Sequence, residues 1–372
     1  MRMDLKQKSR VKWDIDGDEN TSFFHGIIYE NKRKSSIMGI FVGGSWVIDT
    51  VTIKSEVFNF SNKFDELVFD RLKLISDRFK KLTLIEKGAL EAPFTMEEIQ
   101  NVIWCCGSEK APGPDGYTFK FFKKYWEVLK DDFFRFVKFF EVSGSFNKGC
   151  SSSFVSLIPK VNDPISLREY RPINLIGSLY KVISKLLSLR LKLVMDIIIN
   201  PEQSTYVSGR SILDGPLIMN ELYSWEKMVK KKSLFFKVDF GKAFDSLNLG
   251  FLDSILTKMN FGEKWRRWIM GCLKASMASI LVNGSPNLIS RRELAKETLW
   301  LLSYLLSLWK VYMFLWKRLV INIILVMNFI NLNRLLRCFY QASGLKVSIS
   351  KRKVYDVGVD KVEADKLASF LN

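Results

Sequence analysis

The chain has 372 residues, of which 48% are hydrophobic and 13% aromatic, so it can bury the core of two or three lobes and is not wholly disordered. Its net charge of +18 favours a polyanionic partner, first nucleic acid and second an anionic membrane, although a merely basic enzyme also fits. Five cysteines without a CxxC pair and a single histidine argue against a zinc site and suit a reducing compartment.

The first part of the chain predicts short elements. Residues 1–20 are charged and lack the apolar stretch of a secretory signal. The stretch GIFVGGSWVID predicts a β-hairpin that turns at Gly43-Gly44. In APFTMEEIQNVIW, Thr95 can cap a helix and Glu98 can complete a capping box.

A Pro/Gly-dense loop, SEKAPGPDGYT, precedes a helical run over residues 119–141. Apolar side chains recur through that run at helical spacing, which predicts a face turned to the core. The residues of this face are Phe122, Trp126, Phe133, Val137 and Phe140.

The rest of the chain mixes strands and helices. SSFVSLIPK predicts a strand that ends on Lys160, and a long basic helix follows YRPINLIGS and ends before Pro201. SLFFKVDF predicts a buried strand, residues 248–261 and 263–275 predict helices, and SMASILVNGSP predicts a strand that enters a turn. This irregular order predicts the α+β class rather than a repeating βαβ pattern. Neither a Walker A nor a GxGxxG motif occurs, so nothing marks a P-loop or a dinucleotide site.

An aspartate ends the predicted strand in FFKVDFGKAFDSLN. Asp239 follows the apolar run directly, and Asp245 comes six residues later. A carboxylate at the end of a buried strand is costly unless a cation or a donor meets it. A polymerase needs carboxylates at the rim of a sheet to hold two Mg²⁺ ions, and at least one more must approach from a neighbouring strand. The simpler alternative is a helix cap and a surface charge.

Six motifs occur in order along the chain. They are APGPDGYTFKFF, SLIPK, YRPINLIGSLYKVISKLLSLRLK, QSTYVSGRSILDG, FFKVDFGKAFDSLN and VNGSP. This succession resembles the reverse transcriptase of plant-type non-LTR (long interspersed element) retrotransposons from about Trp13 to Pro286, and the likeness resumes at LLRCFYQASGLKVSISK. The resemblance implies an RNA-directed DNA polymerase that acts on an RNA template, a DNA primer and dNTPs, with Mg²⁺ or Mn²⁺ as cofactor.

The resemblance also implies a right-hand polymerase fold with fingers, palm and part of a thumb. It assigns residues 1–90 to a linker upstream of the polymerase, without an endonuclease, residues 91–233 to the fingers and residues 234–290 to the palm. Residues 291–328 are expected to be degenerate and frameshifted, so that the palm is truncated or scrambled after about residue 290. Residues 329–372 are expected to hold the end of the palm and the start of a thumb-like region.

Matching positions carry over the family's catalytic residues. Asp239 is expected to be the catalytic, metal-binding carboxylate, and the carbonyl of Phe240 to complete the metal shell. Phe244 is expected under the incoming sugar, where the family's aromatic residue discriminates against a 2′-hydroxyl.

Other matching positions are expected to contact nucleotide or nucleic acid. Lys160, Arg171 and Lys346 are expected near the template and triphosphate, although Ser348 stands where the family has asparagine. The expected nucleic-acid contacts are Gly209, Arg210, Ser211, Arg190, Asn283 and Gly284. For the basic residues, the simpler alternative is solvated charge. The family further implies a nuclear location, although no compact localisation signal is present, and no stable protein partner is predicted.

The partner that Asp239 needs is missing. In the family it lies in a hairpin that reads [FY]-A-D-D, but the only Asp-Asp pair here is Asp131-Asp132 in the predicted helix, and the family's QGDP turn is missing too. Where both belong stands an apolar run that includes LWLLSYLLSLWKVYMFLW, residues 299–316. A membrane span or a buried pair of amphipathic helices would fit this composition.

A change of reading frame explains the run more specifically. Suppose that the codon of Ala295 ends in C and that the reading frame starts one nucleotide earlier. The codons that residues 296–302 permit can then encode Q-G-D-P-L-A-P, which contains the missing turn. We therefore expect impaired metal binding, no detectable polymerase activity and a tendency to misfold. A residual RNA-binding protein without catalysis is the alternative, since the basic residues of the fingers can still hold RNA non-specifically, namely Arg171, Arg190, Lys192 and Arg210.

Overall fold

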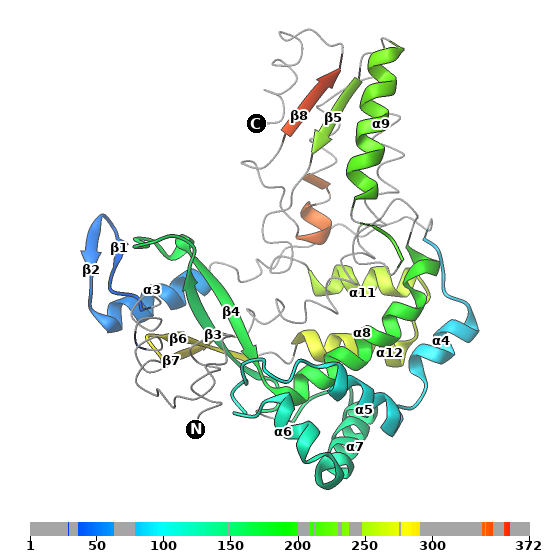
Figure 1. Ribbon diagram of the computed structural model, residues 1–372, viewed down its shortest axis with the longest axis horizontal. Helices are drawn as coiled ribbons and strands as arrows, with labels where there is room; N and C mark the ends of the chain where they lie inside the picture. Colours follow the sequence, from blue (N-terminus) through cyan, green and yellow to red (C-terminus); the bar gives the residue numbers. More distant parts are fainter. Residues whose placement is uncertain are drawn as a thin grey trace, which may run out of the picture. The chain divides into compact units, whose positions relative to one another are not determined.

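The computed structural model describes about three fifths of the chain (Figure 1). The described residues are 29, 36–62, 79–147, 149–199, 209–211, 213–229, 233–237, 248–274, 277–290, 337–338, 340–344 and 353–357. Helices and strands alternate irregularly among them, which confirms the expected mixture of helix and strand. Residues 291–336 lie outside the described residues, so the expected truncation of the palm stays a prediction.

The chain divides into two compact units that interleave along the sequence. The first unit comprises Met1–Asp65, Phe94–Ile183 and Lys274–Glu297, and the second comprises Glu66–Pro93, Ser184–Leu273 and Thr298–Asn372. The expected linker, fingers and palm are consecutive ranges instead, and their boundaries stay predictions.

A four-stranded sheet in the order β4-β3-β6-β7 forms the centre of the first unit. Strand β3 (Ser152–Pro159) runs antiparallel to β4 (Tyr170–Ile176) and parallel to β6 (Met277–Val282), which in turn forms a hairpin with β7 (Ser285–Ser290). A short 3-10 helix, η1 (Leu167–Glu169), leads into β4. The strands predicted from SSFVSLIPK and SMASILVNGSP are thus confirmed.

One face of this sheet is buried. Val155, Ile176, Ile280 and Val282 alternate with more exposed residues along their strands, and each is at most 2% exposed. Helix α3 (Thr50–Asn62) contacts β6 and β7. The period of two therefore leaves the opposite face, which carries Arg171 and Ile173, more exposed.

A small hairpin in the first unit follows the sequence closely. Strands β1 (Ile40–Val42) and β2 (Ser45–Val47) pair around Gly43 and Gly44, whose φ angles are 57° and 87°. A tight hairpin turn needs this left-handed backbone at both central residues, which glycine adopts without strain. The predicted turn at Gly43-Gly44 is confirmed.

Three helices follow in the first unit: α5 (Met96–Cys105), α6 (Phe119–Lys124) and α7 (Trp126–Ser143). The predicted capping box is present, because the Glu98 N–H donates to Thr95 Oγ1 at 3.2 Å and the Thr95 N–H donates to Glu98 Oε2 at 3.0 Å. The predicted helical run over 119–141 is divided at Tyr125, where ψ is 25°. Its predicted core face is buried at every position, namely Phe122, Trp126, Phe133, Val137 and Phe140.

The Pro/Gly-dense loop caps the next helix, α8 (Ser178–Ile198). The backbone N–H of Ser178 donates to Asp115 Oδ2 at 2.5 Å, and the Ser178 hydroxyl donates to the Tyr117 carbonyl at 3.3 Å. A carboxylate at a helix N-terminus satisfies an otherwise unpaired N–H and interacts favourably with the helix dipole. The loop lies so close that a Cβ on Gly113 would overlap the carbonyl group of Ile176.

The second unit combines helices with a two-stranded sheet. Its helices are α4 (Leu84–Glu91), the part of α8 after residue 183, α9 (Asp214–Met228), α11 (Leu249–Lys258) and α12 (Glu263–Lys274). The sheet pairs β5 (Ser233–Lys237) antiparallel with β8 (Lys353–Val357). The predicted helices over 248–261 and 263–275 are confirmed as α11 and α12.

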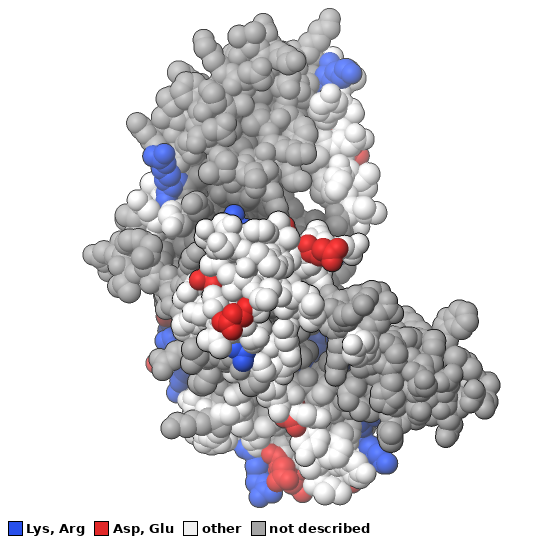
Figure 2. Space-filling view, turned by 90° about the vertical axis from the view of Figure 1, so that its left-hand side faces the viewer, with Lys and Arg blue, Asp and Glu red and all other residues white. Residues whose placement is uncertain are grey.

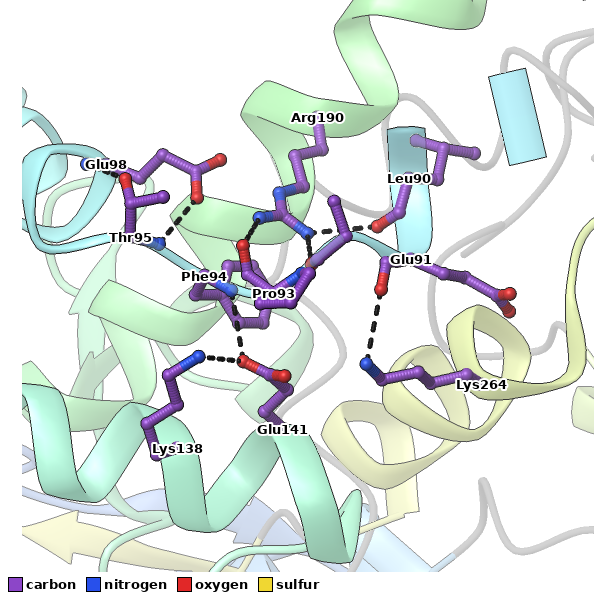
Figure 3. Close-up of polar contacts among 11 residues, drawn as sticks. Leu90, Glu91, Pro93, Phe94, Thr95, Glu98, Lys138, Glu141, Arg190 and Lys264 are labelled. Carbon is purple, nitrogen blue, oxygen red and sulfur yellow. Dashed lines mark hydrogen bonds and ion pairs between the residues drawn. The ribbon is translucent and has the colours of Figure 1, made fainter. Parts of the chain in front are cut away.

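A buried arginine fixes the chain after α4. Arg190 on α8 is 6% exposed, and its Nη1 donates to the carbonyls of Leu90 at 3.1 Å and Ala92 at 2.5 Å, while Nη2 donates to Pro93 at 3.0 Å (Figure 3). The expected nucleic-acid contact of Arg190 is therefore corrected: its guanidinium is buried against the protein backbone rather than presented to a ligand.

Helix α12 contacts the same connection. Lys264 donates to the carbonyl of Glu91 at 3.2 Å (Figure 3). The N–H of Trp265 donates to Glu91 Oε1 at 2.9 Å. A Cβ on Gly262 would overlap that carboxylate, so glycine leaves the room for this helix cap. The connection after α4 is thus bound by side chains of two helices.

No helix among the described residues combines the length and hydropathy that crossing a bilayer requires. The apolar run over 299–316 lies outside the described residues.

We predict that Gly113→Ala destabilises the chain by roughly 1–3 kcal/mol, because the added Cβ must push the loop away from β4. The free energy of unfolding in urea, followed by circular dichroism, measures the effect. Gly88→Ala on α4 is the control, since open space surrounds its Cβ, and it should stabilise by about 0.5–1 kcal/mol. Equal stabilities of the two variants would contradict the close approach.

We predict that Arg190→Ala lowers the free energy of unfolding by roughly 3 kcal/mol, because it leaves buried carbonyl oxygens without their charged donor. Arg190→Lys should lower the free energy of unfolding by a smaller amount, since one ammonium cannot reproduce the planar fork of the guanidinium. Lys192→Ala, at an exposed position of the same helix, should stay within roughly 0.5 kcal/mol of the parent. A variant at Arg190 as stable as the one at Lys192 would refute the role assigned to the guanidinium.

Candidate nucleic-acid interface

The charged side chains of the described residues do not by themselves mark an interface on the face drawn in Figure 2. On the face drawn in Figure 2, the basic and acidic side chains of the described residues are interspersed rather than gathered by sign. The candidate interface therefore has to be built from the geometry of the elements that carry the expected site residues.

Strands β3 and β4 bring two of the expected residues together. Ile158 pairs with Arg171, and the N–H of Lys160 continues the ladder to the carbonyl of Glu169 at 2.7 Å. Because side chains alternate along a strand, Lys160 lies on the same face as Ile158, and hence on the same face as Arg171. Diagonal neighbours of this kind have Cβ atoms roughly 7–8 Å apart. Both basic side chains are exposed.

The two side chains differ in how they are held. Lys160 Nζ donates to the carbonyl of Arg168 at 2.6 Å, which uses one of the three donors of its ammonium. The guanidinium of Arg171, by contrast, forms no hydrogen bond or ion pair with the described residues. Two exposed cations side by side can bind phosphate oxygens, and the planar guanidinium can do so through two parallel bonds.

The same face of the sheet is more apolar beyond the basic pair. Ile173 lies on this face beside Arg171 and is 40% exposed, and Leu281 on β6 lies opposite Ser156 of β3. This surface, made of Lys160, Arg171, Ile173, Ser156 and Leu281, is called the β3–β4 face below. It offers apolar contact next to two positive charges.

Asn283 and Gly284 form the turn of the β6–β7 hairpin, with φ angles of 51° and 81°. The side chain of Asn283 accepts a hydrogen bond from the Ile37 N–H at 2.8 Å and donates one to the Ile37 carbonyl at 3.0 Å. The amide is thus engaged within the protein. Contact of these two residues with nucleic acid stays a prediction.

The segment Gly209, Arg210, Ser211 precedes helix α9. Gly209 has a φ angle of 78°, and Arg210 forms an ion pair with Asp196 at 3.6 Å. The Ser211 hydroxyl accepts from the Leu213 N–H at 3.2 Å, and the Ser211 N–H donates to Asp214 Oδ2 at 3.1 Å. The segment therefore shapes the start of a helix, and its expected contact with nucleic acid stays a prediction.

The expected catalytic residues Asp239, Phe240 and Phe244 lie outside the described residues, as does Lys346. Lys237, the last residue of β5, pairs with Lys353, the first residue of β8. Among the described residues, no group of three or more His, Cys, Asp or Glu could hold a metal ion. The fit of a metal to Asp239 is therefore not established, and we derive no catalytic step from it.

Two features were not anticipated from the sequence. One is the capping of α8 by Asp115, whose partner lies 63 residues away. The other is a row of three aromatic rings on and beside α6, of which the outer two are exposed. Their spacing of four residues is visible in the sequence, but the core face of the same run drew attention away from it.

Comparison with known proteins identifies the region that carries the β3–β4 face. Residues 158–295 match the reverse transcriptase (RNA-dependent DNA polymerase) family. The chain is 29% identical over 283 residues to the "Transposon TX1 uncharacterized 149 kDa protein" of Xenopus laevis, which covers 73% of this chain and 21% of that protein.

Two further relatives are polyproteins of mobile elements. One is the "Retrovirus-related Pol polyprotein from type-1 retrotransposable element R1" of Bradysia coprophila, at 27% identity over 52% of this chain and 18% of that protein. The other is the corresponding R2 polyprotein of Popillia japonica, at 25% identity over 51% of this chain and 26% of that protein. The chain spans about a quarter or less of the length of each relative. By its motifs and these matches, the chain contains a reverse transcriptase domain over residues 158–295 that is similar to those of non-LTR retrotransposon proteins.

Proposed function

We propose that this chain is an RNA-directed DNA polymerase domain that still binds nucleic acid but has lost polymerase activity. The observation that supports nucleic-acid binding is the pairing register of β3 and β4, which places Lys160 beside Arg171 on an exposed face of the sheet. The observation that carries the loss is the lack of any Asp-Asp pair after Asp239 in the sequence.

The β3–β4 face has the chemistry that a nucleic-acid backbone needs. Its two cations can bind neighbouring phosphates, and its apolar residues can contact sugar and base. The expected contacts of Gly209, Arg210, Ser211, Asn283 and Gly284 with template or primer, and of Lys346 with a triphosphate, belong to the same proposal.

The proposed catalytic site begins at the end of β5. Asp239 follows Lys237 by two residues, and Lys237 pairs with the first residue of β8, so two neighbouring strands meet near that end. The family implies Mg²⁺ or Mn²⁺ there, which would activate a 3′-hydroxyl and neutralise a triphosphate. Asp239 and the carbonyl of Phe240 would hold the metal, and Phe244 would lie under the sugar.

An incomplete ligand set explains the proposed inactivity. Hard divalent cations bind through several oxygen ligands, and a lone carboxylate leaves most positions to water. We therefore propose that the metal is bound weakly and that primer extension does not occur.

A second candidate function is non-specific RNA binding without any remaining polymerase architecture. The net charge of +18 favours it, since sequence-independent binding depends mainly on phosphate contacts. The family's need for chromosomal DNA supports a nuclear location as part of the main proposal.

Repair of the reading frame separates these two functions. The chain as given and a repaired chain, which carries Q-G-D-P at residues 296–299 and an Asp-Asp hairpin after it, are compared in primer extension on an RNA template with Mg²⁺. We expect no extension by the first and measurable extension by the second, abolished by Asp239→Asn. A repaired chain that binds RNA but does not extend the primer would favour the binding function instead.

We predict that the double variant Lys160→Ala, Arg171→Ala binds single-stranded RNA more weakly and with a shallower salt dependence. Each lost phosphate contact should reduce the slope of log K against log salt by about 0.7. Fluorescence anisotropy at several salt concentrations measures both quantities.

The matched control removes the same charge from α7. Lys130 and Arg135 form ion pairs with Glu127 and Asp132 on that helix, so Lys130→Ala, Arg135→Ala should change RNA affinity little. Equal losses in the two double variants would mean that net charge, not the β3–β4 face, determines binding.

A further inference from the structure

Three aromatic rings form a row along α6, with an exposed ring at each end and a half-buried ring between them. Tyr117, Phe121 and Tyr125 are spaced four residues apart, and we call them the α6 row. The ring centroids of Tyr117 and Phe121 are 4.7 Å apart with an interplanar angle of 29°, and those of Phe121 and Tyr125 are 4.9 Å apart. Tyr117 is 50% exposed and Tyr125 is 42% exposed. The row is therefore open to a ligand.

The core of the first unit holds one side of this row. Phe119 and Phe122 are 4% and 8% exposed, and Phe122 packs edge-to-face on the buried Phe133 at 5.2 Å. The ring centroids of Tyr117 and Phe121 lie 5.9 and 5.6 Å from that of Phe122, so the row is fixed against the core while its two tyrosines stay exposed. Rings that are stacked and held by a helix present flat faces with little conformational freedom to lose.

Positive charge lies beside the row. Lys120 and Lys124 alternate with its rings along the chain, and Lys124 Nζ lies 5.4 Å from the centroid of Tyr125. Lys123 instead donates to the carbonyl of Cys106 and to Ser108 Oγ. Lys120 lies 3.6 Å from Glu109, a pair in which both side chains are exposed. Lysines outnumber acidic residues over 109–125.

We infer that the α6 row is a stacking platform for single-stranded nucleic acid. Bases would stack on the exposed rings of Tyr117 and Tyr125, and Lys120 and Lys124 would contact the phosphates between them. Aromatic faces with interleaved cations suit a polyanion that carries flat bases, and the net charge of +18 disfavours a basic protein partner. The platform rests on the proposed binding of nucleic acid and adds a second contact region on a different element from the β3–β4 face.

An abasic strand separates base stacking from phosphate binding. The full chain is titrated with a labelled 12-nucleotide uridine strand and with a strand of equal length and charge that lacks bases. We expect Tyr117→Ala, Tyr125→Ala to weaken binding of the uridine strand by about 10-fold or more and to leave the abasic strand unchanged, because only bases stack. The control Tyr117→Phe, Tyr125→Phe keeps both rings and should bind both strands like the parent.

Each other outcome overturns the inference in a distinct way. If the alanine variant binds the uridine strand like the parent while Lys160→Ala, Arg171→Ala still loses affinity, the platform fails and the proposed function stands. If the parent binds neither strand, both fail. If the alanine variant changes only the sedimentation of the chain, the row is a contact between copies rather than a nucleic-acid site. Circular dichroism checks that the variants keep their helices.

Discussion

The second unit depends on how its buried polar backbone is satisfied after α4. Three carbonyls at the end of α4 and just after it, those of Leu90, Ala92 and Pro93, accept from the single guanidinium of Arg190. A buried carbonyl without a donor costs free energy comparable to a lost hydrogen bond, and only arginine offers a planar fork that reaches several at once. With Glu91 capping α12, this one connection is tied to helices from distant parts of the sequence.

A similar constraint shapes the first unit. Asp115 caps α8 from a loop that approaches β4 closely, and the capped helix follows the strand that carries Arg171. The pairing of that strand with β3 then determines which residues share the exposed face. The β3–β4 face is therefore a product of strand register, whereas the charge in Figure 2 shows no such order. The proposed binding face in this unit thus depends on a few backbone contacts rather than on overall composition.

Local signals in the sequence predicted local structure well. The capping box of Thr95 and Glu98, the turn at Gly43-Gly44 and the buried face of the helical run each depend on residues a few positions apart. Contacts between distant residues were not predictable in this way. In the sequence, Arg190 does not differ from the many other basic residues. Only its contacts with residues about 100 positions away show that it is buried. Asp239 and Phe244 were found by family resemblance, and they lie outside the described residues.

The account rests on the claim that the apolar run is a frameshifted copy of the QGDP turn and that the Asp-Asp hairpin after it was lost through a deletion or a spliced gene model. The most direct measurement is the nucleotide sequence, genomic and transcribed, that encodes residues 290–330. We predict that the neighbouring frame reads Q-G-D-P-L-A-P from residue 296 and that the genomic DNA encodes an Asp-Asp hairpin farther on. Codons at Lys296 or Glu297 that forbid glycine and aspartate in that frame would contradict the account, and the apolar run would then be a genuine part of the protein.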